Sequence, residues 1–206
     1  MRDKYTSFAA LEAGGEIAGT DYNTTVRERP ESAVLIVAPH GGSIENGTTE
    51  LADLIAGTDY SLFAFNGLKP RGRNRELHIT SHNFDHPGCI ALAARHAVVL
   101  AVHGCKGESS QLYVGGRDDE LAALLTARLE AASLPVAAPG HKYPGRNPLN
   151  ICNRGARARG AQLEFTLDLR SPSERARIAP LVRSALAEFV TVLARDGYPG
   201  LWRPKP

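Results

Sequence analysis

The sequence predicts an α/β protein in which a mixed sheet lies between helices. Short apolar runs bounded by Gly and Pro, typical of buried strands, alternate with longer segments whose apolar residues recur at helical spacing. The 206 residues are 43% hydrophobic and 22% charged, which is ordinary for a globular protein. Neither a repeat nor a long Ser- or Gly-rich linker divides them, so we expect a single domain over residues 1–206.

The two most apolar runs predict the central strands. Ala33–Ala38 leads into Pro39-His40-Gly41-Gly42, and Ala97–Val102 leads into His103-Gly104. A third strand is predicted over Ala161–Leu167, where Leu163, Phe165 and Leu167 alternate with Gln162, Glu164 and Thr166. Weaker strand signals cover Ser61–Phe65, Leu77–Thr80 and Gln111–Val114.

Apolar periodicity and capping residues predict the helices. The first begins near Thr48 or Thr49, either of which can act as its N-cap, and stops before Gly57. The predicted helices are 48–56, 87–96, 117–132 and 172–195. Residues 66–76 form a basic loop, and residues 133–160, rich in Gly, Pro, Asn and Arg, form a long irregular loop of the kind that often carries function.

Charge and hydropathy exclude several function classes. With 24 basic and 22 acidic residues the net charge is +2, too balanced for a general nucleic-acid binder. The apolar runs are far shorter than the roughly 20 residues of a membrane span, and the N-terminal segment lacks the apolar stretch of a signal peptide. We therefore expect a cytoplasmic monomer without nucleic-acid or membrane partners, released if at all by cell lysis. Three irregularly spaced cysteines support neither a disulfide framework nor a thiolate zinc site.

Two histidines follow buried strands in the same way, each with glycine next to it. His40 and His103 thus stand at rigid strand ends, and glycine leaves room for a ligand near each ring. Glu45, on the turn after His40, can return a carboxylate toward the imidazole. Two histidine nitrogens and one carboxylate, with a fourth position left to water, form the ligand set of a catalytic zinc. The pattern also fits turn histidines that make ordinary hydrogen bonds.

Glu164 is a carboxylate in a strand whose other face is apolar. A buried, unpaired acid is costly, so the residue lies either at a sheet edge, paired with a base such as Arg170, or over a functional cavity. In a cavity it can act as the general base of a hydrolase. The chain contains no GxSxG serine elbow and no Gly-rich nucleotide-binding loop, which disfavours those classes.

Several segments resemble, in order, the motifs of the poly-γ-glutamate hydrolase family first known from phages. The segments are Ala38–Ala52, Leu77–Ser81 with Phe84-Asp85, Ala101–Cys105, Asn150–Arg154 and Gly160–Glu164. The resemblance spans roughly residues 5–195, and the first segment is long and specific.

This resemblance implies a fold, a cofactor and a set of site residues. The family is similar to zinc carboxypeptidases and aspartoacylases, which implies a three-layer fold with a mixed sheet between helices. It implies one zinc ion on His40, Glu45 and His103, with Glu164 as the general base. It further implies that Arg154, next to Asn153, holds a substrate carboxylate.

Basic residues crowd two loops, as expected for a hydrolase of an acidic polymer. They are Lys69, Arg71, Arg73 and Arg75 in one loop and Arg154, Arg157 and Arg159 in the other. Most can be ordinary solvated charges; we favour a substrate role for Arg154 and for one residue of the first loop. His78 is a further candidate for the lining of the pocket, and Tyr113 for a donor to the developing oxyanion.

The sequence thus predicts a zinc-dependent hydrolase that cleaves γ-glutamyl amide bonds of poly-γ-glutamate. Two alternatives remain open at this point. One is the same chemistry on small γ-glutamyl peptides or N-acyl amino acids. The other is a metal-free module that binds acidic polymers through its basic loops.

Overall fold

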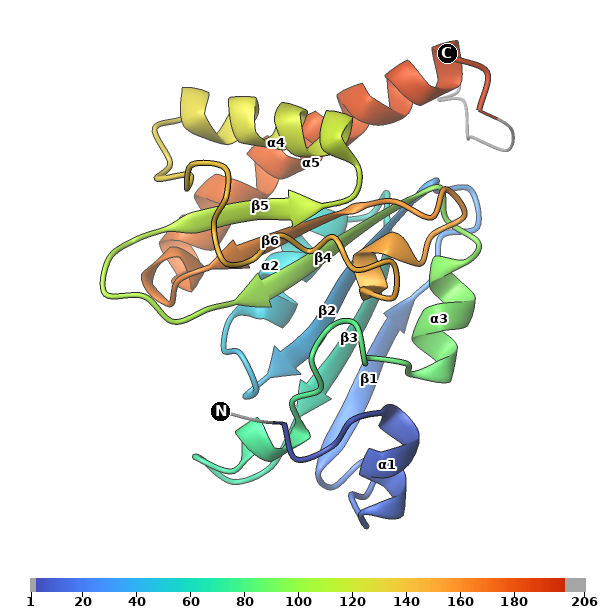
Figure 1. The fold of residues 1–206 in the computed structure, drawn as a ribbon, viewed down its shortest axis with the longest axis vertical. Coiled ribbons are helices and arrows are strands. Elements are labelled where there is room, and N and C mark those ends of the chain that lie inside the picture. The colour runs from blue at the N-terminus through green and yellow to red at the C-terminus, as the bar shows by residue number, and fades with distance from the viewer. Residues whose placement is uncertain (1–2, 199–206) are drawn as a thin grey trace.

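A six-stranded mixed sheet organises the chain, and the computed structural model describes it over residues 3–198 (Figure 1). The strand order is β1-β3-β2-β4-β6-β5. The strands are β1 (Tyr22–Arg27), β2 (Val34–Gly42), β3 (Ser61–Gly67), β4 (Val98–Gly104), β5 (Leu112–Gly116) and β6 (Ala161–Phe165). The four inner strands are parallel to one another, and each edge strand pairs antiparallel to its neighbour. The carboxyl ends of the parallel strands therefore meet at one edge of the sheet, where ligands bind in such folds.

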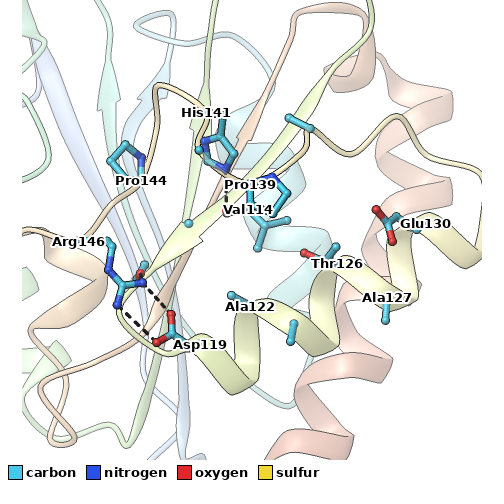
Figure 2. Close-up of a pocket in the computed structure, with 15 residues that line it drawn as sticks. Val114, Asp119, Ala122, Thr126, Ala127, Glu130, Pro139, His141, Pro144 and Arg146 are labelled. Atoms are coloured by element: carbon cyan, nitrogen blue, oxygen red, sulfur yellow. Dashed lines mark hydrogen bonds and ion pairs between the residues drawn. The ribbon is translucent and has the colours of Figure 1, made fainter.

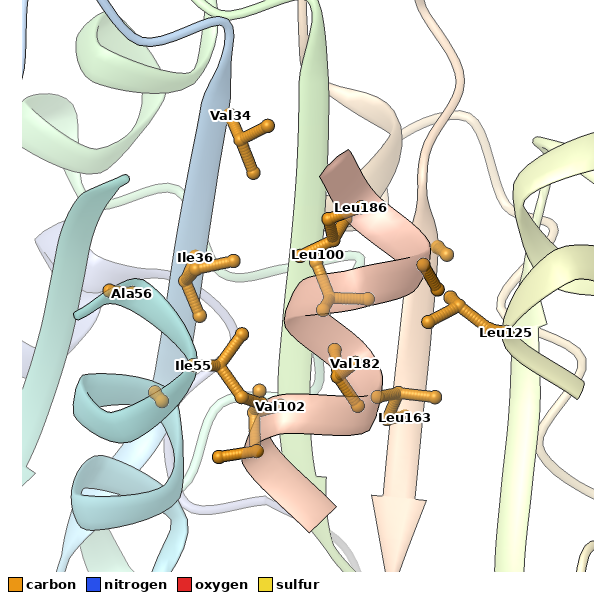
Figure 3. Packing of buried hydrophobic residues seen from close by; sticks show 14 of the residues in the cluster. Val34, Ile36, Ile55, Ala56, Leu100, Val102, Leu125, Leu163, Val182 and Leu186 are labelled. Atoms are coloured by element: carbon orange, nitrogen blue, oxygen red, sulfur yellow. The ribbon is translucent and has the colours of Figure 1, made fainter. Parts of the chain in front are cut away.

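Three helices cover one face of the sheet. They are α2 (Thr48–Ala56), α4 (Asp119–Ala131) and α5 (Pro172–Arg195). Alternate strand residues such as Ile36, Leu100 and Leu163 pack against Val182 and Leu186 of α5 in a continuous apolar cluster (Figure 3). Because each of these side chains is fully buried, each stabilises the fold by roughly 1.5–3 kcal/mol relative to an exposed position.

The opposite face is covered by shorter and less regular elements. These are α1 (Phe8–Ala13), α3 (Pro87–Ala93) and two short 3₁₀ turns, η1 (Asn74–Leu77) and η2 (Ile151–Asn153). A third 3₁₀ turn, η3 (Asp168–Arg170), leads into α5, and its Leu169 packs in the cluster of the helix-covered face. Leu77, Ile79 and Phe84 fill the apolar layer between α1 and α3 although they belong to no long helix or strand. Irregular backbone therefore covers the part of this face that borders the functional site.

The predicted α/β sandwich is confirmed, although three local details differ from the prediction. The helix over residues 48–56 has the predicted bounds, but its N-cap is Gly47, at φ +90°, rather than a threonine. The strand expected over Leu77–Thr80 is wrong, because this segment leaves a 3₁₀ turn as extended chain without pairing in the sheet. The last strand ends at Phe165, so Leu167 turns outward and is 64% exposed.

One α-helix, α1, and one strand, β1, were not predicted from the sequence. The α1 helix has six residues, too few for a periodic signal. Of the β1 residues only Tyr22 is buried, because β1 is an edge strand with water on its outer side. All three cysteines are buried free thiols. Between residues 3 and 198, every helix is too short or too polar to cross a membrane.

Candidate metal centre and active site

The end of β2 turns His40 toward the face that bears the irregular segments. The register with β3 shifts between Ala38 and Gly41, which leaves one extra residue on β2. Strict alternation from Ala38 would place residue 40 among the helices of the opposite face. The extra residue reverses this, and the His40 ring lies beside Ile79 and Phe84 instead. A local bulge therefore aims this side chain, as bulges next to active sites often do.

A tight turn after the strand returns Glu45 to the same place. The backbone N–H of Glu45 donates to the His40 carbonyl (2.9 Å), and the Thr48 hydroxyl donates to the same carbonyl. The Glu45 Oε2 atom accepts a hydrogen bond from the N–H of Gly104 at the end of β4 (2.7 Å). The carboxylate is thereby held between the ends of β2 and β4.

Three imidazole rings surround this carboxylate. His40 Nδ1 lies 3.2 Å from Glu45 Oε1, and His103 Nδ1 lies 3.2 Å from His40 Nδ1 and 3.9 Å from Glu45 Oε2. His78, whose ring stacks on that of His40 at 4.0 Å, brings Nε2 to 3.6 Å from Glu45 Oε1. One donor atom each from His40, Glu45 and His78 lies within 4.8 Å of the others. The cluster thus contains the three residues predicted as ligands and adds His78.

The second nitrogen of each ring has a partner outside the cluster. The pairs are His40 Nε2 with the Ile79 carbonyl (2.8 Å), His103 Nε2 with Ser81 Oγ (3.2 Å) and His78 Nδ1 with Asp3 Oδ1 (2.7 Å). A metal-binding histidine almost always uses its second nitrogen in this way, which fixes the tautomer and the ring orientation. The segment 78–81, which overlaps the strand wrongly expected over Leu77–Thr80, supplies a ring and two of these partners.

Burial and charge favour neutral rings beside an ionised carboxylate. Burial lowers the pKa of His103 to about 3 and also lowers that of His78, while a positive charge on His40 acts in the same direction on both. Burial opposes ionisation of Glu45, but its pKa lies well below the ordinary value because His40 is close. Burial likewise opposes protonation of His40, yet Glu45 raises its pKa. The carboxylate therefore stabilises a positive charge between itself and the rings, which a proton or a divalent cation can supply.

The donor set suits a transition metal such as zinc. Neutral imidazole and carboxylate are ordinary zinc ligands, at about 2.0–2.2 Å from the ion. Two nitrogens at adjacent corners of such a tetrahedron lie about 3.3 Å apart. The separations of His40 Nδ1 from His103 Nδ1 and from Glu45 Oε1, both 3.2 Å, are close to this value. These residues therefore fit the group that the sequence analysis expects.

Glu164 lies next to this cluster and lines the same cavity, of about 730 Å³. In the parallel register between β4 and β6 it stands beside His103, on an inner strand rather than at a sheet edge. Burial raises its pKa to about 8, the Glu45 carboxylate adds to this effect, and Arg170 and Lys142 oppose it. A carboxyl group whose pKa lies near neutral pH can both take up and release a proton, as a general acid–base requires.

Glycine at position 104 makes room for an arginine. A Cβ there would lie 2.5 Å from Cζ of Arg170, whose guanidinium donates to the backbone carbonyls of Phe165 and Asn46. Likewise, a Cβ on Gly41 would collide with Thr49 Oγ1. The two strand-end glycines thus accommodate protein side chains, which corrects the expectation that they leave space for a ligand.

Three cations line the same cavity. Arg75 comes from the first basic loop, as expected for one residue of that loop, and Lys106 and Arg170 complete the set. From the sequence, Arg170 was expected solely as a partner for an exposed Glu164, because nothing in the local sequence shows that it fills the space beside Gly104. Tyr143, from the long loop, also lines the cavity and escaped prediction for the same reason.

Three of the four predicted substrate contacts do not line this cavity, whereas His78 does. Asn153 donates to the carbonyls of Gly145 and Asn147 and accepts from two backbone N–H groups, so its amide stabilises the loop. Arg154 follows it at the end of η2 and is also absent from the lining. Tyr113 on β5 is the strand partner of Glu164 on β6. Its ring packs edge-on against Tyr143, and Tyr143 rather than Tyr113 lines the cavity.

A second cavity, of about 560 Å³, lies between β5, α4 and the loop around Pro139–Arg146 (Figure 2). Ala122, Ala127 and Thr126 of α4 line one side of it, and an ion pair between Arg146 and Asp119 lies at its end. Both partners of this pair are largely exposed to water. This cavity therefore lacks the buried charged groups that distinguish the first.

Comparisons with known proteins identify a family and several relatives of this chain. The family model for poly-gamma-glutamate hydrolase matches residues 5–180. The SPbeta prophage-derived protein YoqZ of Bacillus subtilis is 37% identical over 170 residues, which cover 82% of this chain and 60% of YoqZ. YmaC of the same organism is 38% identical over 170 residues, covering 82% of this chain and 71% of YmaC. The chain thus spans less than two thirds of the length of YoqZ.

Solved structures show the same similarity in three dimensions. A bacteriophage poly-gamma-glutamate hydrolase superimposes with a TM-score of 0.86 at 31% identity, covering 93% of this chain and all of that one. YndL in an apo, zinc-free form gives 0.79 at 32% identity over 92% of this chain and 98% of that one. N-formylglutamate amidohydrolase from Ralstonia eutropha shares the fold, with a TM-score of 0.55 at 12% identity over 86% and 99% of the two chains. With a family model that matches most of its length, this chain belongs to the poly-gamma-glutamate hydrolase family, a family of hydrolases.

Proposed function

We propose that this chain is a zinc-dependent hydrolase that cleaves the γ-glutamyl amide bonds of poly-γ-glutamate. One observation carries the proposal: His40, Glu45 and His103 converge beside Glu164 on a single cavity, in a chain of this family. The structure of the relative YndL is of an apo form described as zinc-free, which supports zinc as the metal.

One zinc ion would be held by His40 Nδ1, the Glu45 carboxylate and His103 Nδ1. When bound there, it supplies a positive charge that lowers the pKa of water and polarises a carbonyl oxygen. The hydrogen bond from the Gly104 N–H holds Glu45 in place. The Ile79 carbonyl and Ser81 hydroxyl hold the two rings.

Glu164 performs the proton transfers. As water attacks the amide carbonyl carbon, the Glu164 carboxylate accepts a proton from it. When the C–N bond breaks, the same group donates that proton to the leaving nitrogen, so Glu164 returns to its ionised form. Its raised pKa, to about 8, matches a group that exchanges protons near neutral pH.

The cations of the cavity recognise the polymer. Poly-γ-glutamate carries a free carboxylate on every unit, and an arginine fork can bind a carboxylate through two hydrogen bonds. Arg75 and Lys106 line the cavity and are the best placed for this role, which the sequence resemblance assigned to Arg154. Tyr143, on the same wall, takes the place proposed for Tyr113 as a donor to the developing oxyanion.

The decisive experiment measures the chain length of poly-γ-glutamate by size-exclusion chromatography after incubation with zinc-loaded protein. A chelator-treated sample and a Glu164→Gln sample serve as controls. Shortening that both controls abolish supports substrate, metal and base together. Intact polymer with zinc bound would redirect the proposal to small γ-glutamyl peptides or N-acyl amino acids. Shortening that survives complete metal removal would contradict the zinc mechanism.

A further inference from the structure

Arg170 is a buried basic residue that has no carboxylate partner. It is 8% exposed, and no acidic group of residues 3–198 forms an ion pair with it. The carboxylates of Glu45 and Glu164 act on its charge from beyond ion-pair distance. By contrast, the buried cations Lys69 and Arg157 each form an ion pair with a buried carboxylate. A buried charge is costly unless it is paired, so the guanidinium of Arg170 is suited to binding an anion.

The same guanidinium has a hydrogen-bond donor that the fold does not use. Nε donates to the Phe165 carbonyl at 3.2 Å, and Nη1 donates to the Asn46 carbonyl. These two bonds fix the plane of the group. Nη2 has no acceptor among the residues that the structure describes, yet it is not sealed from solvent. Because Arg170 lines the larger cavity, Nη2 can donate to a ligand there.

This nitrogen lies near the residue proposed to protonate the leaving group. A Cβ on Gly104 would be 2.9 Å from Nη2, so Nη2 rests against the end of β4. Glu164 lies opposite His103 in the neighbouring strand, one position before Phe165, whose carbonyl holds Nε. The charge of Arg170 also opposes the rise in the pKa of Glu164. An anion on Nη2 would therefore lie close to the leaving nitrogen.

A γ-linked glutamate polymer carries an anion at that point. The leaving nitrogen of each γ-glutamyl bond is attached to the Cα atom of the next unit, which bears a free carboxylate. The carboxylate carbon is thus only about 2.5 Å from the nitrogen. In the unit that supplies the scissile carbonyl, three carbons separate that carbonyl from the carboxylate. An α-linked chain has an uncharged amide at the position next to the leaving nitrogen.

We propose that Arg170 binds the free carboxylate of the leaving glutamate unit and thereby selects γ-linked bonds. The proposal rests on the hydrolase function proposed above and adds which unit is recognised at the scissile bond. Arg75, whose side chain is 47% exposed, and Lys106, also exposed, suit the carboxylates of units farther along the polymer. Arg170 is the buried member of the three, which suits the carboxylate beside the reacting atoms.

The test compares two γ-linked hexaglutamates, one of which has isoglutamine, with a neutral α-carboxamide, as its third unit. The bond before this unit then lacks the carboxylate on the leaving side, whereas the bond after it lacks the carboxylate on the acyl side. Mass spectrometry of the products gives the rate at each bond. Loss of a charged hydrogen bond should slow the first of these bonds by about 10–100-fold relative to the parent oligomer. The second should be cleaved at nearly the parent rate.

Three variants assign this preference to its side chain. Arg170→Gln should cleave the parent oligomer about 10–100-fold more slowly and lose the preference, because its target carboxylate no longer matters. Arg170→Lys keeps the charge and should retain part of the preference. Arg75→Gln is the matched control from the same cavity: it should weaken binding of both oligomers and keep the full preference. Thermal unfolding and zinc content check that each variant is folded and loaded.

The wild-type protein alone decides the main point, so a poorly folded variant does not spoil the test. Equal rates for the two oligomers at the bond before the third unit overturn the proposal. Loss confined to the bond after the third unit overturns it as well, because the acyl unit would then be the one recognised. A folded Arg170→Gln variant that keeps the full preference overturns the assignment to Arg170.

Failure of the proposed function has a different signature. If zinc-loaded protein cleaves neither oligomer, the hydrolase proposal fails for this substrate. Calorimetric binding of γ-glutamyl-glutamate and γ-glutamyl-isoglutamine then tests the present inference without turnover. Tighter binding of γ-glutamyl-glutamate that is lost in Arg170→Gln supports it, and equal affinity for the two dipeptides overturns it.

Discussion

Two cavities among the described residues contain similar residue types in opposite surroundings. Each has a histidine, acidic groups and arginine in its wall. In the larger cavity, His40 and His103 are almost fully buried and Glu45 contacts both. In the smaller cavity, the Asp119 and Arg146 side chains are 74% and 58% exposed (Figure 2). Water screens an exposed pair, so its charges interact weakly, whereas buried charges shift one another's protonation. Burial, rather than residue composition, therefore distinguishes the candidate active site from the smaller cavity.

The largest expected effect comes from Glu164→Gln. Glutamine keeps the shape of the side chain but cannot carry the proton, so kcat on poly-γ-glutamate should fall by about 10²–10⁴-fold. Bound zinc, measured by elemental analysis, should remain at the wild-type level. Turnover close to that of the wild type would remove Glu164 from the role of base.

The His103→Ala variant tests whether His103 binds the metal ion in the larger cavity. Removing one proposed ligand should weaken zinc binding by more than the ~10–100-fold typical of an outer partner. Zinc content after dialysis against a weak chelator measures this, and His96→Ala provides a buried control, because that ring instead contacts Ser61 and Leu92. Unchanged zinc content in His103→Ala would contradict the ligand assignment.

Gly104→Ala tests the packing beneath the site. The new methyl group would overlap the buried Arg170 guanidinium, and overpacking of this kind costs roughly 1–3 kcal/mol. We expect a lower urea midpoint and reduced turnover. Gly88→Ala is the matched control, since its methyl group would approach no atom closer than 3.3 Å. Equal stability of the Gly104 and Gly88 variants would show that Arg170 moves aside freely.

The smallest effect is expected in the second cavity. Asp119→Ala and Arg146→Ala break an exposed ion pair, and such pairs contribute little to stability. Turnover, zinc content and the thermal midpoint should all stay at wild-type values. A marked loss of polymer cleavage in either variant would instead show that the smaller cavity also binds the substrate.

The architecture was predictable from the sequence, and so was the convergence of His40, Glu45 and His103. Buried strands and amphipathic helices have local patterns, so the inner strands and the helices α2, α4 and α5 were predictable near their true positions. His40 and His103 lie at the carboxyl ends of β2 and β4, and Glu45 lies on the turn after β2. Because parallel strands end at a common edge, these residues were expected together before any geometry was known.

The groups that complete the site depend on tertiary contacts that the sequence pattern does not show. The extra residue in β2 sets the direction of His40, and the contact with Asp3 sets that of His78. Arg170 enters through the space beside Gly104, whereas Arg154, marked by its motif, stays outside the lining. These placements depend on contacts between residues far apart in the chain and on irregular backbone. Long-range contacts and irregular backbone produce no periodic pattern in the sequence, because such patterns arise only where a regular helix or strand buries one face.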